Sequence, residues 1–308
     1  MGLSQIGRAL GGLIAVVFVA GCTAALPTGT PGATSSRTAT VGPATTPCPT
    51  QQAIPSESPP TAGACAVLPG GTFGPLTFDD EFNGAELDTS RWHVDAAQDM
   101  GPDQPWRRNY KNENVYLKDG ALVIRAAKEN PGYSTAAIVT GKKGQPNPFE
   151  QAFGRYETRM RLPTQPGHGG AFWLWNESET NVDGSGRDGT EIDIFERIWL
   201  DDTADHALHW DGYDADQQSA VQMVKGMGLT DGGWHTIRLD WYPDRYVFFI
   251  DGKETWHTSA GGVDQTPNFV ILSDEICNWG TAPIDQATLP DYTYYDYVRV
   301  WAYVPPQQ

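Results

Sequence analysis

Residues 191–196 read EIDIFE, with three acidic residues interleaved among three apolar ones. Because side chains of a β-strand point alternately to its two faces, Glu191 and Asp193 would share one face and the two isoleucines the other. In a regular strand Glu196 would join the isoleucines, where an unpaired carboxylate is costly to bury. One extra residue, a β-bulge near Phe195, would return Glu196 to the acidic face. We therefore expect a bulged strand with one core face and one face that carries three acids.

Short strand-like runs separated by turn signals recur on both sides of this stretch. They cover residues 121–126, 155–162, 236–242, 246–250 and 296–301. Asp251 and Gly252 follow one of these runs and indicate a tight hairpin turn. The abundance of glycine (34), proline (23) and tryptophan (11) also favours an all-β protein with many turns. We expect a β-sandwich of antiparallel strands over residues 72–304.

The formal net charge of −17 limits the kinds of partner. A phosphate backbone needs a basic surface, so we expect no nucleic-acid partner. The same acidity disfavours a sulfated glycan and favours a neutral sugar, although it could also serve solubility alone. We expect the protein to act as a monomer.

The first 22 residues read as an export signal. Arg8 supplies the positive start, and the apolar run 10–19 is short for a membrane span. The run leads through Val-Ala-Gly to Cys22, which resembles a bacterial lipobox with Cys22 as the lipidated mature N-terminus. The alternative is an ordinary cleaved signal with an incidental cysteine. We expect an exported protein, either a cell-membrane lipoprotein or an extracellular one.

Residues 23–71 are rich in Thr, Pro, Ala, Ser and Gly, which predicts a flexible linker between the membrane and a globular domain. Cys48 and Cys65 lie in this linker, and Cys277 lies in the expected domain. An exported protein can keep disulfides. Cys65 could pair with either of the other two cysteines, and one thiol would be left over in both cases.

The acids of residues 191–196 suit glycoside hydrolysis. With the bulge, Glu191 and Glu196 are four strand steps apart, roughly 13 Å between backbones at about 3.3 Å per residue. On a concave sheet two long side chains that lean inward can close most of this gap, and retaining hydrolases need about 5–5.5 Å between carboxyl groups. Asp193 would share a proton or a hydrogen bond with them. The alternatives are a solvated strand face and a calcium site.

The chain resembles glycoside hydrolase family 16 over nearly all of the expected domain. Besides the acidic hexapeptide, similar motifs occur in the family's order at residues 78–84, 87–88, 91–92, 114–115, 119–122, 153–157, 170–174, 234–235, 241, 251–252 and 296–300. The resemblance implies a concanavalin A-like β-jelly roll with a concave substrate cleft and a retaining mechanism. In it Glu191 matches the nucleophile, Asp193 the assisting acid and Glu196 the general acid/base.

We expect no cofactor for catalysis, but the resemblance suggests a structural calcium near Glu81, the Gly120 carbonyl and Asp296. The alternative is that the two carboxylates only make hydrogen bonds.

Two departures concern members of the family that act on β-1,3-glucan. Ala137 stands where those members carry an arginine, and residues 187–190 read RDGT where Trp-Pro often precedes the nucleophile. Both features usually touch the sugar on the non-reducing side. Their absence bears on the linkage cleaved and not on the hydrolytic chemistry.

Six further residues are candidates for contacts with a sugar, because aromatic rings stack on the apolar faces of sugars. They are Trp173, Trp175, His209, Trp210, Trp106 and Trp279. Trp173 and Trp175 share a strand face, His209 and Trp210 follow the catalytic strand, and the other two lie in loop-like stretches. Ordinary core packing is the alternative for the tryptophans, and a structural role is the alternative for His209.

We therefore predict a retaining, endo-acting glycoside hydrolase of a β-linked polysaccharide, with β-1,3- or β-1,3-1,4-glucan as the best match. A cell-wall transglycosylase and an endo-hydrolase of a β-galactan are alternatives within the same chemistry. A glycan-binding module without catalysis is the least favoured, because all three acids are present.

Overall fold

The structure, a computed structural model, describes residues 67–68, 71–94, 110–130, 132–141, 148–276 and 283–307. Several predictions fall outside these ranges, namely the signal segment 1–22 with Cys22, most of the linker, Cys48, Cys65, Cys277, Trp106 and Trp279. Within the described ranges, no helix combines the length and the apolarity of a membrane span.

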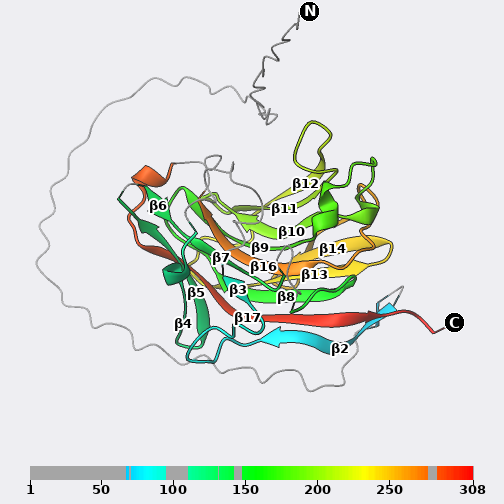
Figure 1. Ribbon diagram of the computed structural model, residues 1–308, viewed down its shortest axis with the longest axis horizontal. Coiled ribbons are helices and arrows are strands. Elements are labelled where there is room, and N and C mark those ends of the chain that lie inside the picture. The colour runs from blue at the N-terminus through cyan, green and yellow to red at the C-terminus, as the bar shows by residue number, and fades with distance from the viewer. Residues whose placement is uncertain are drawn as a thin grey trace, which may run out of the picture. The chain divides into compact units, whose positions relative to one another are not determined.

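Antiparallel strands form two sheets that lie one above the other (Figure 1). In the described part of the chain, the larger sheet has ten strands. They are β1 (Val67–Leu68), β2 (Gly71–Asp80), β4 (Val115–Lys118), β5 (Ala121–Lys128), β6 (Tyr133–Ser134), β8 (Gly154–Arg161), β13 (Trp234–Tyr242), β14 (Arg245–Ile250), β15 (Lys253–Thr258) and β17 (Asp291–Val304). The long strand β17 joins this sheet, because it pairs with β5, β8 and β2 along its length.

The second sheet has seven strands in the same ranges, in the order β12-β11-β10-β9-β16-β7-β3. They are β3 (His93–Val94), β7 (Ala136–Val139), β9 (His168–Trp175), β10 (Glu191–Arg197), β11 (Thr203–Trp210), β12 (Gln218–Lys225) and β16 (Phe269–Ile276). Short 3-10 helices lie in the connections: η3 (Asn112–Asn114), η4 (Glu177–Thr180), η5 (Gly186–Asp188) and η6 (Ile284–Gln286).

The five strand-like runs predicted from the sequence lie in β5, β8, β13, β14 and β17, with ends that differ by a few residues. Asp251 and Gly252 have φ values of 50° and 75°, as the tight hairpin between β14 and β15 requires. The all-β jelly-roll sandwich is thus confirmed. Strand β1 pairs with β2 inside the segment predicted as linker, and the boundary at residue 72 stays a prediction.

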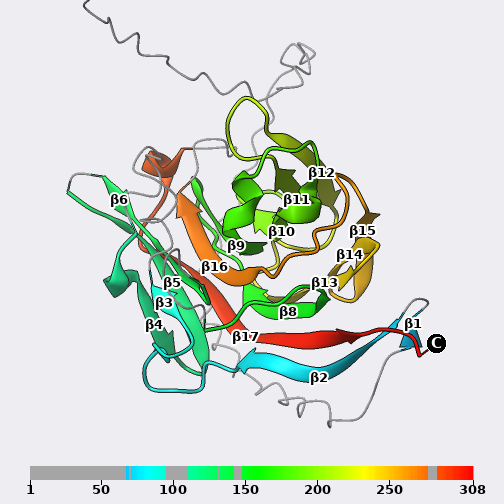
Figure 2. The same cartoon turned by 45° about the vertical axis from the view of Figure 1, so that its right-hand side comes forward.

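The main core lies between the sheets. It joins residues of the larger sheet, such as Tyr156 and Leu239, to residues of the smaller one, such as Phe172 and Ile192. A second cluster, with Trp173 and other residues of β7, β9 and β16, covers the opposite face of the seven-stranded sheet. We call this opposite face the acid face; Figure 2 shows its strands β16, β9, β10 and β11 side by side.

Candidate active site

Strand β10 carries the three acids and contains the predicted bulge. Against β11, Asp193 pairs with Ala207 and Glu196 with Asp205, so three steps on β10 oppose two on its neighbour. Against β9, the register shifts between Asp193 and Phe195. The extra residue expected near Phe195 is therefore confirmed.

The bulge sorts the side chains of β10 between the two faces. Ile194 and Phe195 are consecutive, yet both are buried in the main core. Glu196 consequently returns to the acid face, opposite Ala171, which belongs to the second cluster. An apolar side chain thus fills the core position that the carboxylate would occupy in a regular strand.

His206 on β11 fixes the bulge from the core side. Its Nδ1–H donates to the carbonyl of Ile194 at 2.6 Å, and its Nε2 accepts from Thr255 Oγ1 at 2.8 Å. The imidazole is fully buried and stacks on Phe248. Burial lowers the pKa of His206 to about 4, so the ring is neutral. Its single N–H proton forms the hydrogen bond to the Ile194 carbonyl.

Two of the three acids and a histidine lie close together on the acid face. One ligand atom from each of Glu191, Asp193 and His209 lies within 4.8 Å of the others. His209 faces Glu191 across the strand pair, and its Nε2 lies 3.4 Å from Oδ2 of Asp193. Such a trio could also hold a metal ion, although an imidazole suits a transition metal better than calcium.

Glu196 is partly exposed, and its carboxyl group is poised to act as an acid. Burial raises the pKa of Glu196 well above its usual range, and four neighbouring carboxylates raise it further. In decreasing order of effect they are Asp193, Asp205, Glu275 and Glu191. A raised pKa favours the protonated form of the carboxyl group, which is the form that a general acid needs.

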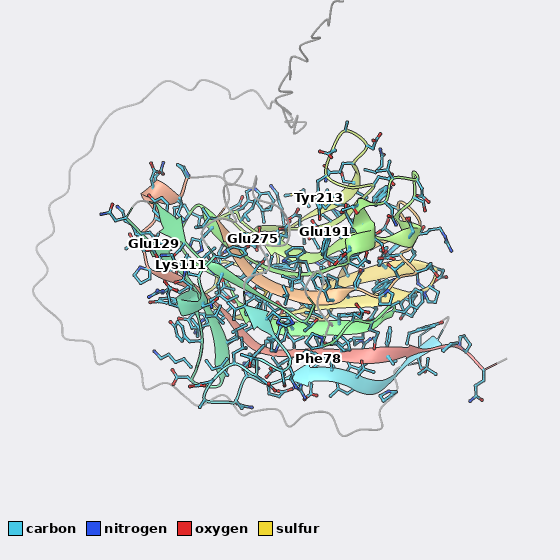
Figure 3. All side chains as sticks on the ribbon, viewed as in Figure 1. Phe78, Lys111, Glu129, Glu191, Tyr213 and Glu275 are labelled. Carbon is cyan, nitrogen blue, oxygen red and sulfur yellow. The ribbon has the colours of Figure 1, made fainter. Side chains whose placement is uncertain are left out.

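Four residues near the acids were not predicted from the sequence. Tyr213, in the turn after β11, donates a short hydrogen bond to Oε2 of Glu191, and the two residues lie together in Figure 3. Asp205 faces Glu196 across the strand pair, and burial raises the pKa of Asp205 to about 7. The alternation of residues 203–210 could have revealed Asp205, since it places Asp205 and His209 on the same face.

Glu179 and Glu275 complete the set from more distant parts of the chain. Glu179 on η4 is fully buried, and burial together with the charge of Glu191 raises the pKa of Glu179 to about 7. Glu275 on β16 accepts a hydrogen bond from Ser273 Oγ at 3.2 Å. Neither residue stands in a sequence pattern that points to β10.

The predicted aromatic residues divide between the two faces. Trp173 and Trp175 lie on the acid face as expected, and the Trp173 indole donates to Ser273 Oγ at 3.0 Å. Their contact with a sugar stays a prediction. Trp210 alternates with His209 and lies in the main core, and its contact with a sugar also stays a prediction.

The residues expected around calcium meet where β2, β5 and β17 adjoin, but their carboxylates are already paired. Arg299 donates to both carboxylate oxygens of Glu81, at 2.7 and 2.8 Å. Asp296 Oδ2 lies 3.4 Å from a guanidinium nitrogen of Arg159. Gly120 occupies a left-handed turn there, with φ of 76°. As arranged, these side chains do not fit a calcium ion, and the calcium stays a prediction that enters no step below.

Comparison with known proteins agrees with this architecture. Residues 103–298 match the family described as glycosyl hydrolases family 16, and the chain belongs to this family. It is similar to glucan endo-1,3-beta-glucosidase A1 of Niallia circulans, with 26% identity over 258 residues. That match covers 73% of this chain but 37% of the relative, so the chain spans little more than a third of the relative's length.

Solved structures of other proteins align with this chain over nearly the whole of their own length. The laminarinase of Flavobacterium sp. UMI-01 is 27% identical, with a TM-score of 0.59, 74% of this chain covered and 100% of that chain. The endo-beta-1,3-glucanase of Pyrococcus furiosus is 24% identical and shares the fold, with a TM-score of 0.63 and coverage of 79% and 99%.

Proposed function

We propose that the protein is a retaining, endo-acting hydrolase of a neutral β-glycan, with β-1,3- or β-1,3-1,4-glucan as its substrate. The observation that carries the proposal is the bulge of β10, which brings Glu196 to the face of Glu191 and Asp193. The raised pKa of Glu196 supports its assignment as the acid of the pair.

The proposed reaction is a double displacement. A carboxylate oxygen of Glu191 bonds to the anomeric carbon while the glycosidic bond breaks, and Glu196 gives its proton to the departing oxygen. Glu196, now ionised, takes a proton from a water molecule whose oxygen bonds to the anomeric carbon and releases Glu191. Oδ2 of Asp193 lies 3.4 Å from Nε2 of His209. Asp193 is proposed to balance the charges of the two glutamates as these charges change between the two steps.

Names of relatives support glucan as the substrate, since the Niallia protein is a glucan endo-1,3-beta-glucosidase and the Flavobacterium protein a laminarinase. The assignment of the glycosidic linkage has less support. Ala137 is fully buried on the acid face, where the arginine of other members is absent, and residues 187–190 fall at η5 beside β10. A substrate panel must therefore accompany the test of mechanism.

The test uses purified protein with β-1,3-, β-1,3-1,4- and β-1,4-glucans and β-galactans, with product sizes measured over time. We expect internal cleavage of a β-glucan. Glu191→Gln should lower kcat by about 10³-fold or more, because an amide cannot form the glycosyl ester. Glu254→Gln on the exposed part of β15 is the matched control and should keep wild-type activity.

Undiminished turnover by Glu191→Gln would reject the assignment of the nucleophile. Cleavage of β-galactan alone would replace the substrate and keep the mechanism. Products longer than the starting oligosaccharide at high acceptor concentration would show a transglycosylase instead.

We also propose that the enzyme is an exported monomer anchored through lipid at Cys22, which the lipobox-like sequence before Cys22 supports. Mass spectrometry of the protein recovered from membranes should find an acylated N-terminal cysteine. Cys22→Ala should release the protein from the membrane fraction, and an unmodified Cys22 in membrane-bound protein would contradict lipidation. Light scattering of the released protein should give the mass of one chain.

A further inference from the structure

The turn after β11 holds Tyr213 in a defined place. Asp211 and Gly212 have φ values of 64° and 75°, so two consecutive left-handed residues reverse the chain. The buried carboxylate of Asp211 accepts from the backbone N–H groups of Asp183 and Gly184, at 3.0 and 3.1 Å. The N–H of Gly212 donates to the carbonyl of Glu179 at 2.9 Å. The residues just before Tyr213 are therefore fastened to the loops beside η4.

This fastening brings the Tyr213 hydroxyl to the nucleophile. The phenol donates to Oε2 of Glu191, while Tyr213 keeps 39% of its surface exposed. Glu191 itself is almost fully buried. The exposed ring consequently borders the place where a sugar must approach the carboxylate.

We propose that Tyr213 is a catalytic residue that stabilises the Glu191 carboxylate as it leaves the sugar in the second step of the reaction. The inference rests on the proposed function. In the glycosyl-enzyme, one oxygen of Glu191 is bonded to the anomeric carbon and Oε2 is the ester carbonyl oxygen. When water replaces Glu191, that bond breaks and its electron pair returns to the carboxylate.

The hydrogen bond from Tyr213 strengthens as this charge develops, because a bond to an ionised acceptor is stronger than one to a neutral carbonyl. The phenol proton stays on Tyr213 throughout, so no further acid or base is required. In the first step the same bond is weakened, since the carboxylate loses its charge to the ester. Loss of the hydroxyl should therefore slow the second step selectively.

A neighbouring carboxyl group is a poorer candidate for this task. Asp193 lies within 4.8 Å of Glu191, but a carboxyl group donates a hydrogen bond only while it is protonated. A phenol donates without any change of charge.

The test compares wild type and Tyr213→Phe on a 2,4-dinitrophenyl glycoside of a short oligosaccharide from the polymer that the wild type cleaves. With this leaving group the first step is fast and the second limits kcat. We expect kcat of Tyr213→Phe to fall about 10- to 100-fold, with much less change in kcat/KM. A burst of one dinitrophenol per enzyme and a glycosyl-enzyme visible by mass spectrometry should accompany the loss.

Two matched pairs make the result specific. Tyr292→Phe, on β17 of the other sheet, should behave as wild type. Asp211→Ala should reproduce the loss in kcat, whereas Asp211→Asn keeps an oxygen acceptor for the two backbone N–H groups and should lose far less.

Unchanged kcat in Tyr213→Phe would overturn the inference, and so would equal losses in kcat and kcat/KM without a burst. Failure of the proposed function would look different, since wild type would then be inactive or Glu191→Gln would be as active as wild type.

Discussion

Carboxylates are arranged in two different ways at two places, beside Arg155 in the ten-stranded sheet and on the acid face of the seven-stranded sheet. In the ten-stranded sheet, Asp240 on β13 is fully buried and accepts two hydrogen bonds from Arg155, at 2.7 and 2.9 Å. On the acid face of the seven-stranded sheet, Glu191 and Asp193 lie within 4.8 Å of each other, and Glu196 and Asp205 face one another. The first arrangement pairs a carboxylate with a guanidinium, and the second places carboxyl groups next to one another.

This difference separates structural from chemical use of the same side chain. The two hydrogen bonds from Arg155 hold Asp240 in a structural pair. Burial, followed by the neighbouring carboxylates of the acid face, raises the pKa of Glu196 well above its usual range, which suits a group that gives a proton and later takes one. The same crowding should lower stability at neutral pH, where the paired carboxylate should raise it.

The largest effect should come from removing the proton of Glu196. Glu196→Gln should lower kcat/KM for the polysaccharide by about 10³-fold, because the departing sugar then leaves without protonation. A dinitrophenyl glycoside needs no such proton, and its kcat/KM should change little. Equal losses for both substrates would show that Glu196 is not the general acid.

Removing Asp240 should cost stability and not chemistry. Asp240→Ala leaves the Arg155 guanidinium without its partner, and the free energy of unfolding should fall by about 3–5 kcal/mol in urea titrations. Activity per folded molecule should persist, since Asp240 lies in the other sheet. Asp244→Asn, at the exposed pair with Arg245, is the control and should leave stability nearly unchanged. A variant as stable as wild type would remove the contrast between the two sheets.

The bulge that forms the acid face could be predicted from the sequence, because a regular strand cannot place all three acids of residues 191–196 on one face. Strict alternation would bury Glu196 with Ile194, so a bulge was required, and the register of β10 contains it. Five strands of the larger sheet were likewise predictable; for example, alternation in residues 155–161 returns as alternating burial in β8.

The rest of the site depends on distant segments that no local pattern connects. Tyr213 reaches Glu191 from a turn, and Glu179 approaches it from η4. Trp210 was a candidate because it follows the catalytic strand, and alternation with His209 places it in the main core. The hydrogen bond from His206 to the bulge carbonyl depends on packing between β11 and Thr255 of the opposite sheet.

Glu179 should show how much stability is lost when a buried carboxyl group near Glu191 becomes ionised. Its pKa is raised from about 4.5 to about 7, first by burial and then by Glu191. Between these two pH values the folded protein keeps a proton that the unfolded chain has lost. Stability should therefore fall as pH rises through this window, by about 3 kcal/mol in total.

Glu179→Gln should remove that dependence. Free energies of unfolding measured at pH 5 and pH 8 should differ less in the variant than in wild type, by about the same 3 kcal/mol. Burial also raises the pKa of Asp264, to about 6, so a part of the slope should remain. Identical pH dependence in the two proteins would mean that Glu179 is ionised in the folded state.

The smallest effect should be a shift of the pH profile of kcat/KM and not a loss of activity. Asp205 faces Glu196, and its negative charge helps to raise the pKa of Glu196. Asp205→Asn removes this charge with little change of shape, so Glu196 should lose its proton at lower pH. The basic limb of the kcat/KM profile should then move down by about one pH unit.

Asp216→Asn, in the exposed turn before β12, provides the control for this shift and should leave the profile in place. The limb should not return to the range of an ordinary glutamate, because burial is the larger cause of the raised pKa and the Asp205→Asn substitution does not alter it. A limb that moves upward, or not at all, would show that Asp205 is already protonated when Glu196 titrates. Burial and Asp193 would then be sufficient to hold the proton of the general acid.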